Sequence, residues 1–331
     1  MAARPTVAIT DSDLASTEDE RVLREAGLTA VRLQASTEDG LIAALSRRPA
    51  DALIVQWAPV TAAVLDAAPG CRFISRLGIG IDMIDVAAAT GRGVAVANTP
   101  DYCVDEVVAH TLAMALWLVR GLGRFDAAVR DGQWAAAAAY PAAGRPAGTV
   151  VGVVGLGRIG AQVAGQAAAL GFEVLGHDPY AAAPGGVRLT SLEDLLRGSH
   201  LVTLHAPLTP ETRHLIRADT IGLMPPGALL VNTCRGGLID EAAVAAALRA
   251  GRLAGAAMDV FETEPLPADS PLRSLPNVLL SPHAAWYSKA SLAALPVRAA
   301  QQVVDFLGGL DVPSIVNPEY LGHVAQRRLR V

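Results

Sequence analysis

The sequence predicts an α/β protein with two doubly wound parallel-sheet domains. Short runs rich in β-branched residues alternate with Ala-rich segments of helical length, in one series that begins with "TVAIT" at residue 6 and a second that begins with "TVVGVVG" at residue 149. The chain has 331 residues and is 52% hydrophobic, which suits two cores better than one. A glycine-rich turn follows the first strand of the second series, as in many doubly wound sheets.

The first series contains four expected strands with helices between them. The strands are "TVAIT", "ALIVQW", "RFISRLG" and "VAVANT", which begin at residues 6, 52, 72 and 94, and the helices include "TEDERVLREAG" and "TEDGLIAALSRR". Alternation of strand and helix predicts parallel strands joined by helical crossovers.

The second series contains six expected strands, "TVVGVVG", "FEVLGHD", "LVTLHAP", "ALLVNT", "LAGAAMDV" and "NVLLSP". A helix over residues 103–120 is expected to open this unit, so a domain boundary near residue 100 is predicted. A further helical segment follows "HAAWYS", and its pattern alone assigns it to neither unit.

Charge and composition argue against several classes of partner. A formal net charge of -5 is opposite to the basic patches that nucleic acids require. The most apolar stretch, "VVAHTLAMALWLV", is too short to cross a bilayer and is interrupted by His110. The N-terminus has no signal-peptide pattern, and three cysteines in such a chain indicate reduced thiols. We therefore expect a cytoplasmic protein with no nucleic-acid or membrane partner and no metal site.

The glycine-rich turn has the spacing of a dinucleotide site. Gly155 suits a tight turn, Gly157 lets the backbone approach a pyrophosphate, and Gly160 allows the helix to pack on the strand. Arg158 and Ile159 lie at the helix N-terminus, where free N–H groups and the helix dipole favour an anion. The alternative, a glycine-rich turn without a ligand, is weakened by the flanking strand and helix.

An acidic residue completes this pattern. Asp178 lies 18 residues beyond Gly160 at the end of the next expected strand, where a carboxylate binds ribose hydroxyls. Its charge would repel a 2'-phosphate, and Pro179 and Tyr180 follow it in place of a basic residue. The sequence therefore predicts NAD in preference to NADP.

Polar residues gather at the expected ends of four other strands, which is where an open sheet binds ligands. Arg235 can grip a carboxylate with its planar guanidinium, and His283 is suited to proton transfer near neutral pH, with Glu264 as its candidate partner. On these residues alone, a loop histidine and a surface ion pair remain equally good interpretations.

Five motifs taken together resemble one family. "GLGRIG", "HAPLTPETRHLI", "LVNTCRGGLID", "GAAMDVFETEPLP" and "SPHAAWYS" resemble the D-isomer specific 2-hydroxyacid dehydrogenases over nearly the whole chain. "AAWYS" after the histidine is similar to the C-terminal binding protein branch. The resemblance implies a flavodoxin-like substrate domain of residues 1–99 and 288–331, and an inserted Rossmann NAD-binding domain of residues 100–287. Helix 103–120 then resembles the family's dimerisation element, and a homodimer is expected.

The resemblance also implies roles for individual residues. His283 would be the general acid and base, Glu264 its carboxylate partner and Arg235 the substrate anchor. Asp259 would lie beside the nicotinamide. Further cofactor contacts are expected at Thr111, His205, Ala206, Pro207, Thr212, Thr233, Cys234 and Trp286. Substrate contacts are expected at the backbone of Leu77, Gly78 and Ile79 and at the side chains of Trp57 and Trp286.

The expected activity is NAD-dependent interconversion of a 2-oxo acid and a D-2-hydroxy acid, with closure of an interdomain cleft. Because an indole at Trp286 or Trp57 would offer an apolar surface, 2-oxo acids with hydrophobic or thioether tails are favoured; the alternative for each tryptophan is a place in the core. Two other functions remain open: an NAD-responsive scaffold of the C-terminal binding protein type, and phosphite oxidation. Cys234 is interpreted as a small buried residue, with a reactive thiolate as the alternative.

Overall fold

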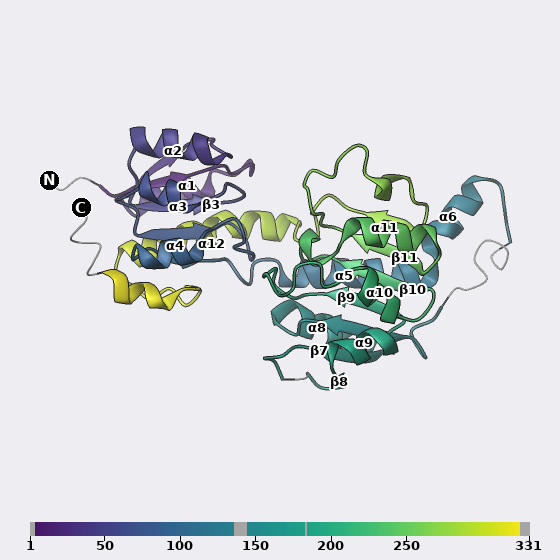
Figure 1. Ribbon diagram of the computed structural model, residues 1–331. Coiled ribbons are helices and arrows are strands. Elements are labelled where there is room, and N and C mark those ends of the chain that lie inside the picture. Colours follow the sequence, from purple (N-terminus) through teal and green to yellow (C-terminus); the bar gives the residue numbers. More distant parts are fainter. Residues whose placement is uncertain (1–3, 136–143, 183, 325–331) are drawn as a thin grey trace. The chain divides into compact units, whose positions relative to one another are not determined.

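The computed structural model describes residues 4–135, 144–182 and 184–324 (Figure 1). The chain forms two compact units. Unit 1 consists of Met1–Cys103 and Tyr287–Val331, and unit 2 of Val104–Trp286. These boundaries differ by a few residues from the predicted ranges 1–99 with 288–331 and 100–287. No helix in the described part of the chain is long and apolar enough to span a membrane.

Unit 1 is built on a parallel five-stranded sheet in the order β2-β1-β3-β4-β5. This is the flavodoxin-like strand order. The central strands read as continuous apolar runs because both faces are covered by helices, and every residue of β3 and β4 is buried. The strands are β1 (Thr6–Ile9), β2 (Thr29–Arg32), β3 (Ala52–Val55), β4 (Phe73–Arg76) and β5 (Ala95–Ala97).

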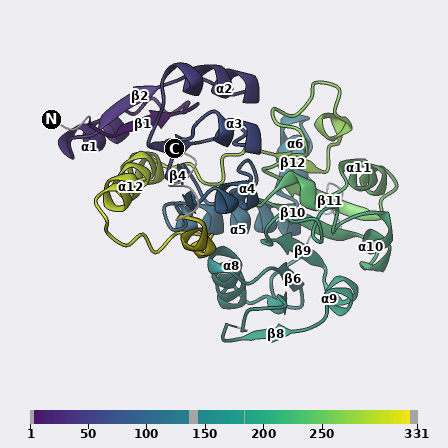
Figure 2. The same ribbon diagram turned by 60° about the vertical axis from the view of Figure 1, so that its left-hand side comes forward.

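The helices of unit 1 come from both ends of the chain. The long C-terminal helix α12 (Lys289–Leu307) packs on β4 and α1, which Figure 2 shows. Phe306 stacks on Phe73 with ring centroids 4.4 Å apart, and Gln302 Oε1 accepts a hydrogen bond from Ser75 at 2.9 Å. The shorter helices are α1 (Glu18–Glu25), α2 (Glu38–Arg47), α3 (Ala62–Asp66), α4 (Val86–Gly91) and the 3-10 helix η3 (Pro318–His323).

Unit 2 is built on a parallel seven-stranded sheet in the order β12-β11-β10-β9-β6-β7-β8. Counted from β6, this is the Rossmann order 3-2-1-4-5-6 with one strand added after the sixth. The prediction of two doubly wound parallel-sheet domains is therefore confirmed. The strands are β6 (Val150–Val154), β7 (Glu173–His177), β8 (Val187–Leu189), β9 (Leu201–Leu204), β10 (Ala228–Asn232), β11 (Leu253–Met258) and β12 (Val278–Leu280).

Each face of the unit 2 sheet packs on its own set of helices. Side chains of α5 and α8 form one core with one face of the sheet. Side chains of α9, α10 and α11 form another core with the opposite face. The helices are α5 (Val104–Arg120), α6 (Leu122–Arg130), α8 (Arg158–Ala169), α9 (Leu192–Gly198), α10 (Ala218–Leu223) and α11 (Glu241–Arg249), with 3-10 helices η1 (Gly236–Leu238) and η2 (Pro271–Ser274).

Several helices begin at a polar residue whose side chain accepts a hydrogen bond from a first-turn N–H group. Such caps satisfy backbone donors that have no partner inside the helix. The capping residues of α2, α3, α4, α9, α11 and α12 are Thr37, Thr61, Asp85, Ser191, Asp240 and Ser288.

Candidate active site

The carboxyl edge of the unit 2 sheet has a topological switch point. The strand order reverses between β6 and β9, because the chain leaves β6 towards β7 on one side and later continues from β9 towards β10 on the other. Ligands of open α/β sheets bind outside the strand ends at such a point. The glycine turn directly follows Val154 at the end of β6, and His205 directly follows Leu204 at the end of β9.

Two of the three glycines of the turn, Gly155 and Gly160, are required sterically, and the third lies beside open space. Gly155 has a φ of +90°, and a Cβ there would lie 2.6 Å from the carbonyl carbon of His205. A Cβ at Gly160 would lie 2.0 Å from the Gly155 oxygen, so helix α8 can approach the turn only with glycine there. Gly157 is the N-cap of α8, has no side-chain oxygen to cap it, and a Cβ there would meet nothing within 4 Å. Open space therefore lies beside Gly157 at the N-terminus of α8, the end of a helix that favours an anion.

Asp178 is tied to the same turn. Its Oδ2 accepts a hydrogen bond from the Leu156 N–H at 2.8 Å, and its Oδ1 accepts from Tyr180 and Ala181 N–H at 2.8 and 3.0 Å. Although partial burial alone would raise the pKa of Asp178, these backbone donors hold it below its usual value. The structure thus places an ionised carboxylate beside the glycine turn, at the end of β7.

His205 lies at the end of β9, against Gly155 and Gly160. Its Nε2 lies 2.9 Å from Thr203 Oγ1. Burial lowers the pKa of His205 to about 4, so the imidazole is neutral at physiological pH. A neutral imidazole at His205 can lie next to a bound dinucleotide without adding a positive charge at the switch point.

The residues that follow His205 form a tight loop held by side chains. Thr212 Oγ1 donates to the Pro207 carbonyl at 2.7 Å and accepts from the Thr209 N–H at 2.8 Å. The Cys234 thiol donates to the Ala206 carbonyl at 3.1 Å, which joins the loops after β9 and β10. The Thr212 hydroxyl and the Cys234 thiol, both predicted along the cofactor, therefore shape the backbone of that edge.

Thr111 and Thr233 join helix α5 to the end of β10. Their hydroxyl oxygens are 2.7 Å apart, and Thr111 Oγ1 also donates to the Val107 carbonyl at 2.7 Å. Thr111, which was predicted to contact the cofactor, is only 1% exposed, so its side chain lies beneath the surface of the site.

His283 and Glu264 form a close pair. His283 Nδ1 lies 2.7 Å from Glu264 Oε2, and Glu264 Oε1 accepts from the Phe261 N–H at 2.9 Å. Although burial would raise the pKa of Glu264, the hydrogen bond and charge of His283 and the Phe261 N–H hold it below its usual value, and Arg235 adds to this. His283 has a left-handed φ of +52°, which is costly for a residue with a Cβ.

Arg235 follows β10 and reaches the same cluster. Its positive charge contributes to lowering the pKa of Glu264, so the two side chains lie in one electrostatic environment. Its Nη1 donates to the Cys234 carbonyl at 2.7 Å. Gly236, the next residue, allows the backbone to pass close to Phe261, since a Cβ at Gly236 would lie 1.8 Å from the Phe261 carbonyl carbon. The structure thus brings together the histidine, the carboxylate and the arginine that the sequence separates widely.

Asp259 lies beneath the loop that carries His283. Its side chain is fully buried, and Oδ1 accepts hydrogen bonds from Ser281 Oγ at 2.5 Å and Ala284 N–H at 2.8 Å. Oδ2 accepts from Ala285 N–H at 2.9 Å. The carboxylate therefore holds the loop that carries His283, and its predicted place beside the nicotinamide stays a prediction. Sequence reasoning missed Ser281, although it lies two residues before His283 at the end of β12.

The predicted carboxylate loop of unit 1 requires two corrections. Leu77 is buried and its N–H donates to the Val55 carbonyl at 2.7 Å, because the sheet pairing continues past β4. Gly78 N–H donates back to the Arg76 carbonyl at 2.9 Å in a tight turn. Ile79 is half-buried and its carbonyl accepts from Asn98 Nδ2 at 2.7 Å. The N–H groups of Leu77 and Gly78 are therefore not free donors for a substrate.

Two side chains of unit 1 stand at the end of its sheet. Trp57 is 40% exposed, which contradicts a core position, and the Arg76 guanidinium carbon lies 5.3 Å from the centre of its ring. A Cβ at Gly78 would lie 1.5 Å from Arg76 Nη1, so glycine makes room for the guanidinium. Trp286, the last residue of unit 2, is half-buried. Sequence reasoning missed Arg76, whose signal was a charged residue at the end of a buried strand.

Comparison with known proteins decides the family. The model of the NAD binding domain of D-isomer specific 2-hydroxyacid dehydrogenases matches residues 112–285, more than half of the 331 residues. The chain belongs to this family.

Members of the dehydrogenase family with several names are similar to this chain. A D-3-phosphoglycerate dehydrogenase of Mycobacterium bovis is 42% identical over 288 residues, which cover 84% of this chain and 53% of the relative. A glyoxylate reductase of Korarchaeum cryptofilum is 38% identical over 271 residues, 79% of this chain and 80% of the relative. The chain spans about half the length of the phosphoglycerate dehydrogenases it matches.

The fold of the chain is also similar to solved structures. A D-lactate dehydrogenase from Aquifex aeolicus, complexed with NAD and lactic acid, superposes with a TM-score of 0.81 and 28% identity, over 97% of this chain and 98% of that one. Together with the match to the family's NAD-binding domain, this confirms the prediction of NAD as the cofactor. The open space before the α8 N-terminus and the carboxylate of Asp178 fit that cofactor.

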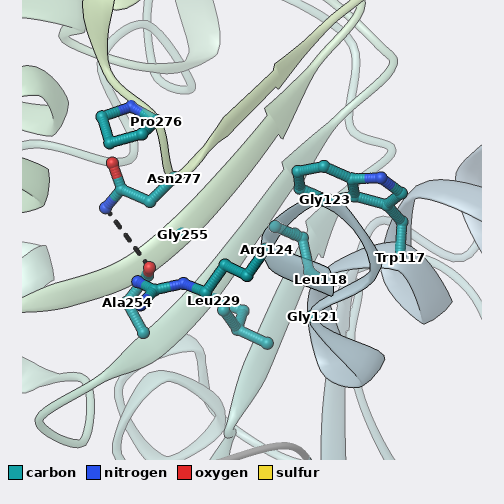
Figure 3. Close-up of a pocket in the computed structure, with 10 residues that line it drawn as sticks. All are labelled: Trp117, Leu118, Gly121, Gly123, Arg124, Leu229, Ala254, Gly255, Pro276 and Asn277. Carbon is teal, nitrogen blue, oxygen red and sulfur yellow. Dashed lines mark hydrogen bonds between the residues drawn. The ribbon is translucent and has the colours of Figure 1, made fainter. Parts of the chain in front are cut away.

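The opposite edge of the unit 2 sheet has a separate hollow (Figure 3). Leu229, Ala254 and Asn277 line it at the beginnings of β10, β11 and β12, whereas the candidate site lies at the other ends of these strands. It is therefore not part of the candidate site. Within the described residues no cluster of His, Cys, Asp and Glu side chains could hold a metal ion.

Proposed function

We propose that this chain is an NAD-dependent D-2-hydroxyacid dehydrogenase that interconverts a 2-oxo acid and a D-2-hydroxy acid. One observation carries the proposal: His283 Nδ1 lies 2.7 Å from Glu264, and Arg235 is close enough to lower the pKa of that carboxyl, at the same sheet edge as the glycine turn. This supplies a proton donor, its orienting carboxylate and a cation for the substrate.

The proton transfer follows from the orientation of His283. Because Nδ1 faces the Glu264 carboxylate, its proton stays in that hydrogen bond, and Nε2 is the nitrogen that exchanges a proton with the substrate. In reduction, protonated His283 donates from Nε2 to the oxygen at C2 of the 2-oxo acid. In oxidation, neutral His283 accepts the hydroxyl proton at the same nitrogen. Bound NADH or NAD supplies or accepts the hydride at C2.

Arg235 would bind the substrate and polarise its carbonyl group. A guanidinium can form two parallel hydrogen bonds, which suits a carboxylate next to a carbonyl oxygen. Its charge also stabilises the negative oxygen that develops at C2 before His283 completes the proton transfer. The backbone of Ile79 in unit 1 stays our proposed contact to the substrate carboxylate, because the N–H groups of Leu77 and Gly78 already donate to carbonyl groups.

We propose a substrate with an apolar or thioether tail. The exposed indole of Trp57 and the half-buried indole of Trp286 are apolar surfaces, which favour such tails over a phosphate group. The names of the relatives, D-3-phosphoglycerate dehydrogenase and glyoxylate reductase, make 3-phosphohydroxypyruvate and glyoxylate the substrates to compare.

A substrate panel tests the proposal. NADH oxidation, followed by its absorbance, should be fast with an apolar or thioether 2-oxo acid and slower with glyoxylate or 3-phosphohydroxypyruvate, and the product should be the D-enantiomer. Tight NADH binding without turnover of any 2-oxo acid would instead support an NAD-responsive scaffold of the C-terminal binding protein branch, to which we relate the "AAWYS" motif. Reduction of NAD with phosphite would support the phosphite oxidation alternative.

The assembly and location are also part of the proposal. We place the protein in the cytoplasm as a homodimer, with α5 at the interface, and with no nucleic-acid or membrane partner. Light scattering at micromolar concentration should give twice the mass of one chain. A monomeric mass would contradict the dimer without affecting the proposed chemistry.

A further inference from the structure

His110 lies in the middle of helix α5, on a largely apolar stretch of that helix. Neighbouring residues of this helix, among them Val107, Val108 and Leu112, are buried in the core of unit 2. The His110 side chain is 30% exposed, and its Nε2 lies 3.1 Å from Ser281 Oγ. The histidine therefore reaches from α5 to the end of β12, two residues before His283.

The direction of the hydrogen bonds at Ser281 follows from Asp259. Both oxygens of the Asp259 carboxylate act as acceptors, and Ser281 Oγ lies 2.5 Å from Oδ1, so the Ser281 proton points to Asp259. Ser281 Oγ then accepts at its other side, and His110 Nε2 is the donor. The result is a hydrogen-bonded chain from His110 through Ser281 to a fully buried carboxylate.

The same carboxylate determines the shape of the loop that carries His283. Asp259 accepts from the N–H groups of Ala284 and Ala285, and the His283 N–H donates to the Asp259 carbonyl at 2.7 Å. The left-handed φ of +52° at His283 is a conformation that persists only when its surroundings impose it. Any rotation of the Asp259 carboxylate would release these contacts and the orientation of the His283 ring.

We propose that His110, acting through Ser281, is a positioning residue for His283. It holds the Asp259 carboxylate in the rotamer that binds Ala284 and Ala285, and so keeps His283 directed at the substrate. His110 transfers no proton to the substrate. The role in turnover rests on the proposed dehydrogenase function, whereas the role in holding the loop does not.

The kinetic test uses variants of the two residues that lead to Asp259, His110 and Ser281. His110→Phe and Ser281→Ala should each lower kcat by roughly 10- to 100-fold, since small misplacement of a reacting group has effects of this size. KM for the 2-oxo acid and the Kd for NADH should change by less than about threefold. His110→Gln, whose amide N–H can replace the Nε2 donor, should recover most of kcat. The double variant His110→Phe with Ser281→Ala should be no slower than the slower single variant, because the two residues act in one chain.

Amide hydrogen exchange tests the loop without any turnover. In the unmodified protein the amides of Ala284 and Ala285 should exchange slowly, and in His110→Phe they should exchange at least tenfold faster while the melting temperature stays nearly unchanged. If no 2-oxo acid is turned over, the proposed function fails, and the exchange comparison still decides the role of His110. Unchanged exchange at these two amides in His110→Phe, or single-variant losses in kcat that multiply in the double variant, would overturn the inference.

Discussion

Nδ1 of His283 lies 2.7 Å from Oε2 of Glu264, and both residues lie on loops that follow neighbouring strands of one sheet. A second pair in the same unit has nearly the same geometry: His214 has a φ of +51°, and its Nε2 lies 2.6 Å from Glu262 Oε1. The two pairs differ in the ring nitrogen that the carboxylate binds. They provide the proposed catalytic residue and a matched control within one chain.

Replacing His283 by Ala should lower kcat by about 10²- to 10⁴-fold, because the proton donor is lost. His214→Ala removes a histidine with the same backbone strain and a similar hydrogen bond, and should leave kcat within about twofold. Steady-state kinetics with NADH and the best 2-oxo acid compare the two variants, with circular dichroism as the check on folding. Equal losses in both would mean that backbone geometry, not proton transfer, explains the effect.

Replacing Arg235 by Lys should lower kcat/KM by roughly 10²-fold, because an ammonium ion lacks the planar pair of donors. Much of this loss should appear as a higher KM for the 2-oxo acid, with little change in the Kd for NADH. Arg213→Lys, at an exposed arginine of the same unit, is the control. Near-native kcat/KM in Arg235→Lys would argue that a point charge is sufficient there.

The cofactor preference should depend on Asp178. Because its carboxylate also binds three backbone N–H groups, Asp178→Ser with Tyr180→Arg keeps an acceptor while replacing the negative charge by a positive one. Tyr180 is 96% exposed, so the arginine has room. The ratio of kcat/KM for NADPH to that for NADH should rise by at least tenfold. The single variant Tyr180→Arg should change this ratio less, and equal use of both cofactors by the unmodified protein would contradict the role of Asp178.

Stability should fall with acid because of His205. Its pKa is lowered from 6.5 to about 4 in the folded state, so the unfolded chain binds a proton at pH values where the folded chain does not. The free energy of unfolding is therefore highest above about pH 6.5 and decreases as the pH falls towards 4, by at most about 3 kcal/mol from this group. Urea unfolding at pH 7 and pH 5 should show a larger loss for the unmodified protein than for His205→Gln. Equal losses in both proteins would mean that other groups cause the effect.

Much of the fold was predictable because central strands are buried on both faces. Their runs of Val, Ile, Leu and Ala stand out in the sequence, whereas β2 and β8 were missed. Both are edge strands, and their residues are exposed or half-buried, so they lack a continuous apolar run. The helix expected over residues 103–120 was found as Val104–Arg120, because its apolar periodicity is long.

The predictable parts of the candidate site were those in which a residue type has a single chemical use, such as glycine in a tight turn. The glycine spacing and the order of the five motifs indicated the cofactor site and the family. The roles of Asp259 and Leu77 were not predictable in the same way. Whether a carboxylate faces a ligand or holds a loop depends on which backbone N–H groups surround it, and that is set by tertiary contacts.

Unit 1 is assembled from the two ends of the chain, and this has a consequence for synthesis. Unit 2 is continuous, so it leaves the ribosome complete while β4 still lacks α12. Until α12 emerges, Phe73 has no Phe306 to stack on, and Ser75 lacks its hydrogen-bond partner Gln302, which lies 227 residues later in the sequence. The nascent N-terminal segment therefore presents an uncovered apolar sheet face throughout translation of unit 2. We expect a chaperone to bind the nascent chain at this face.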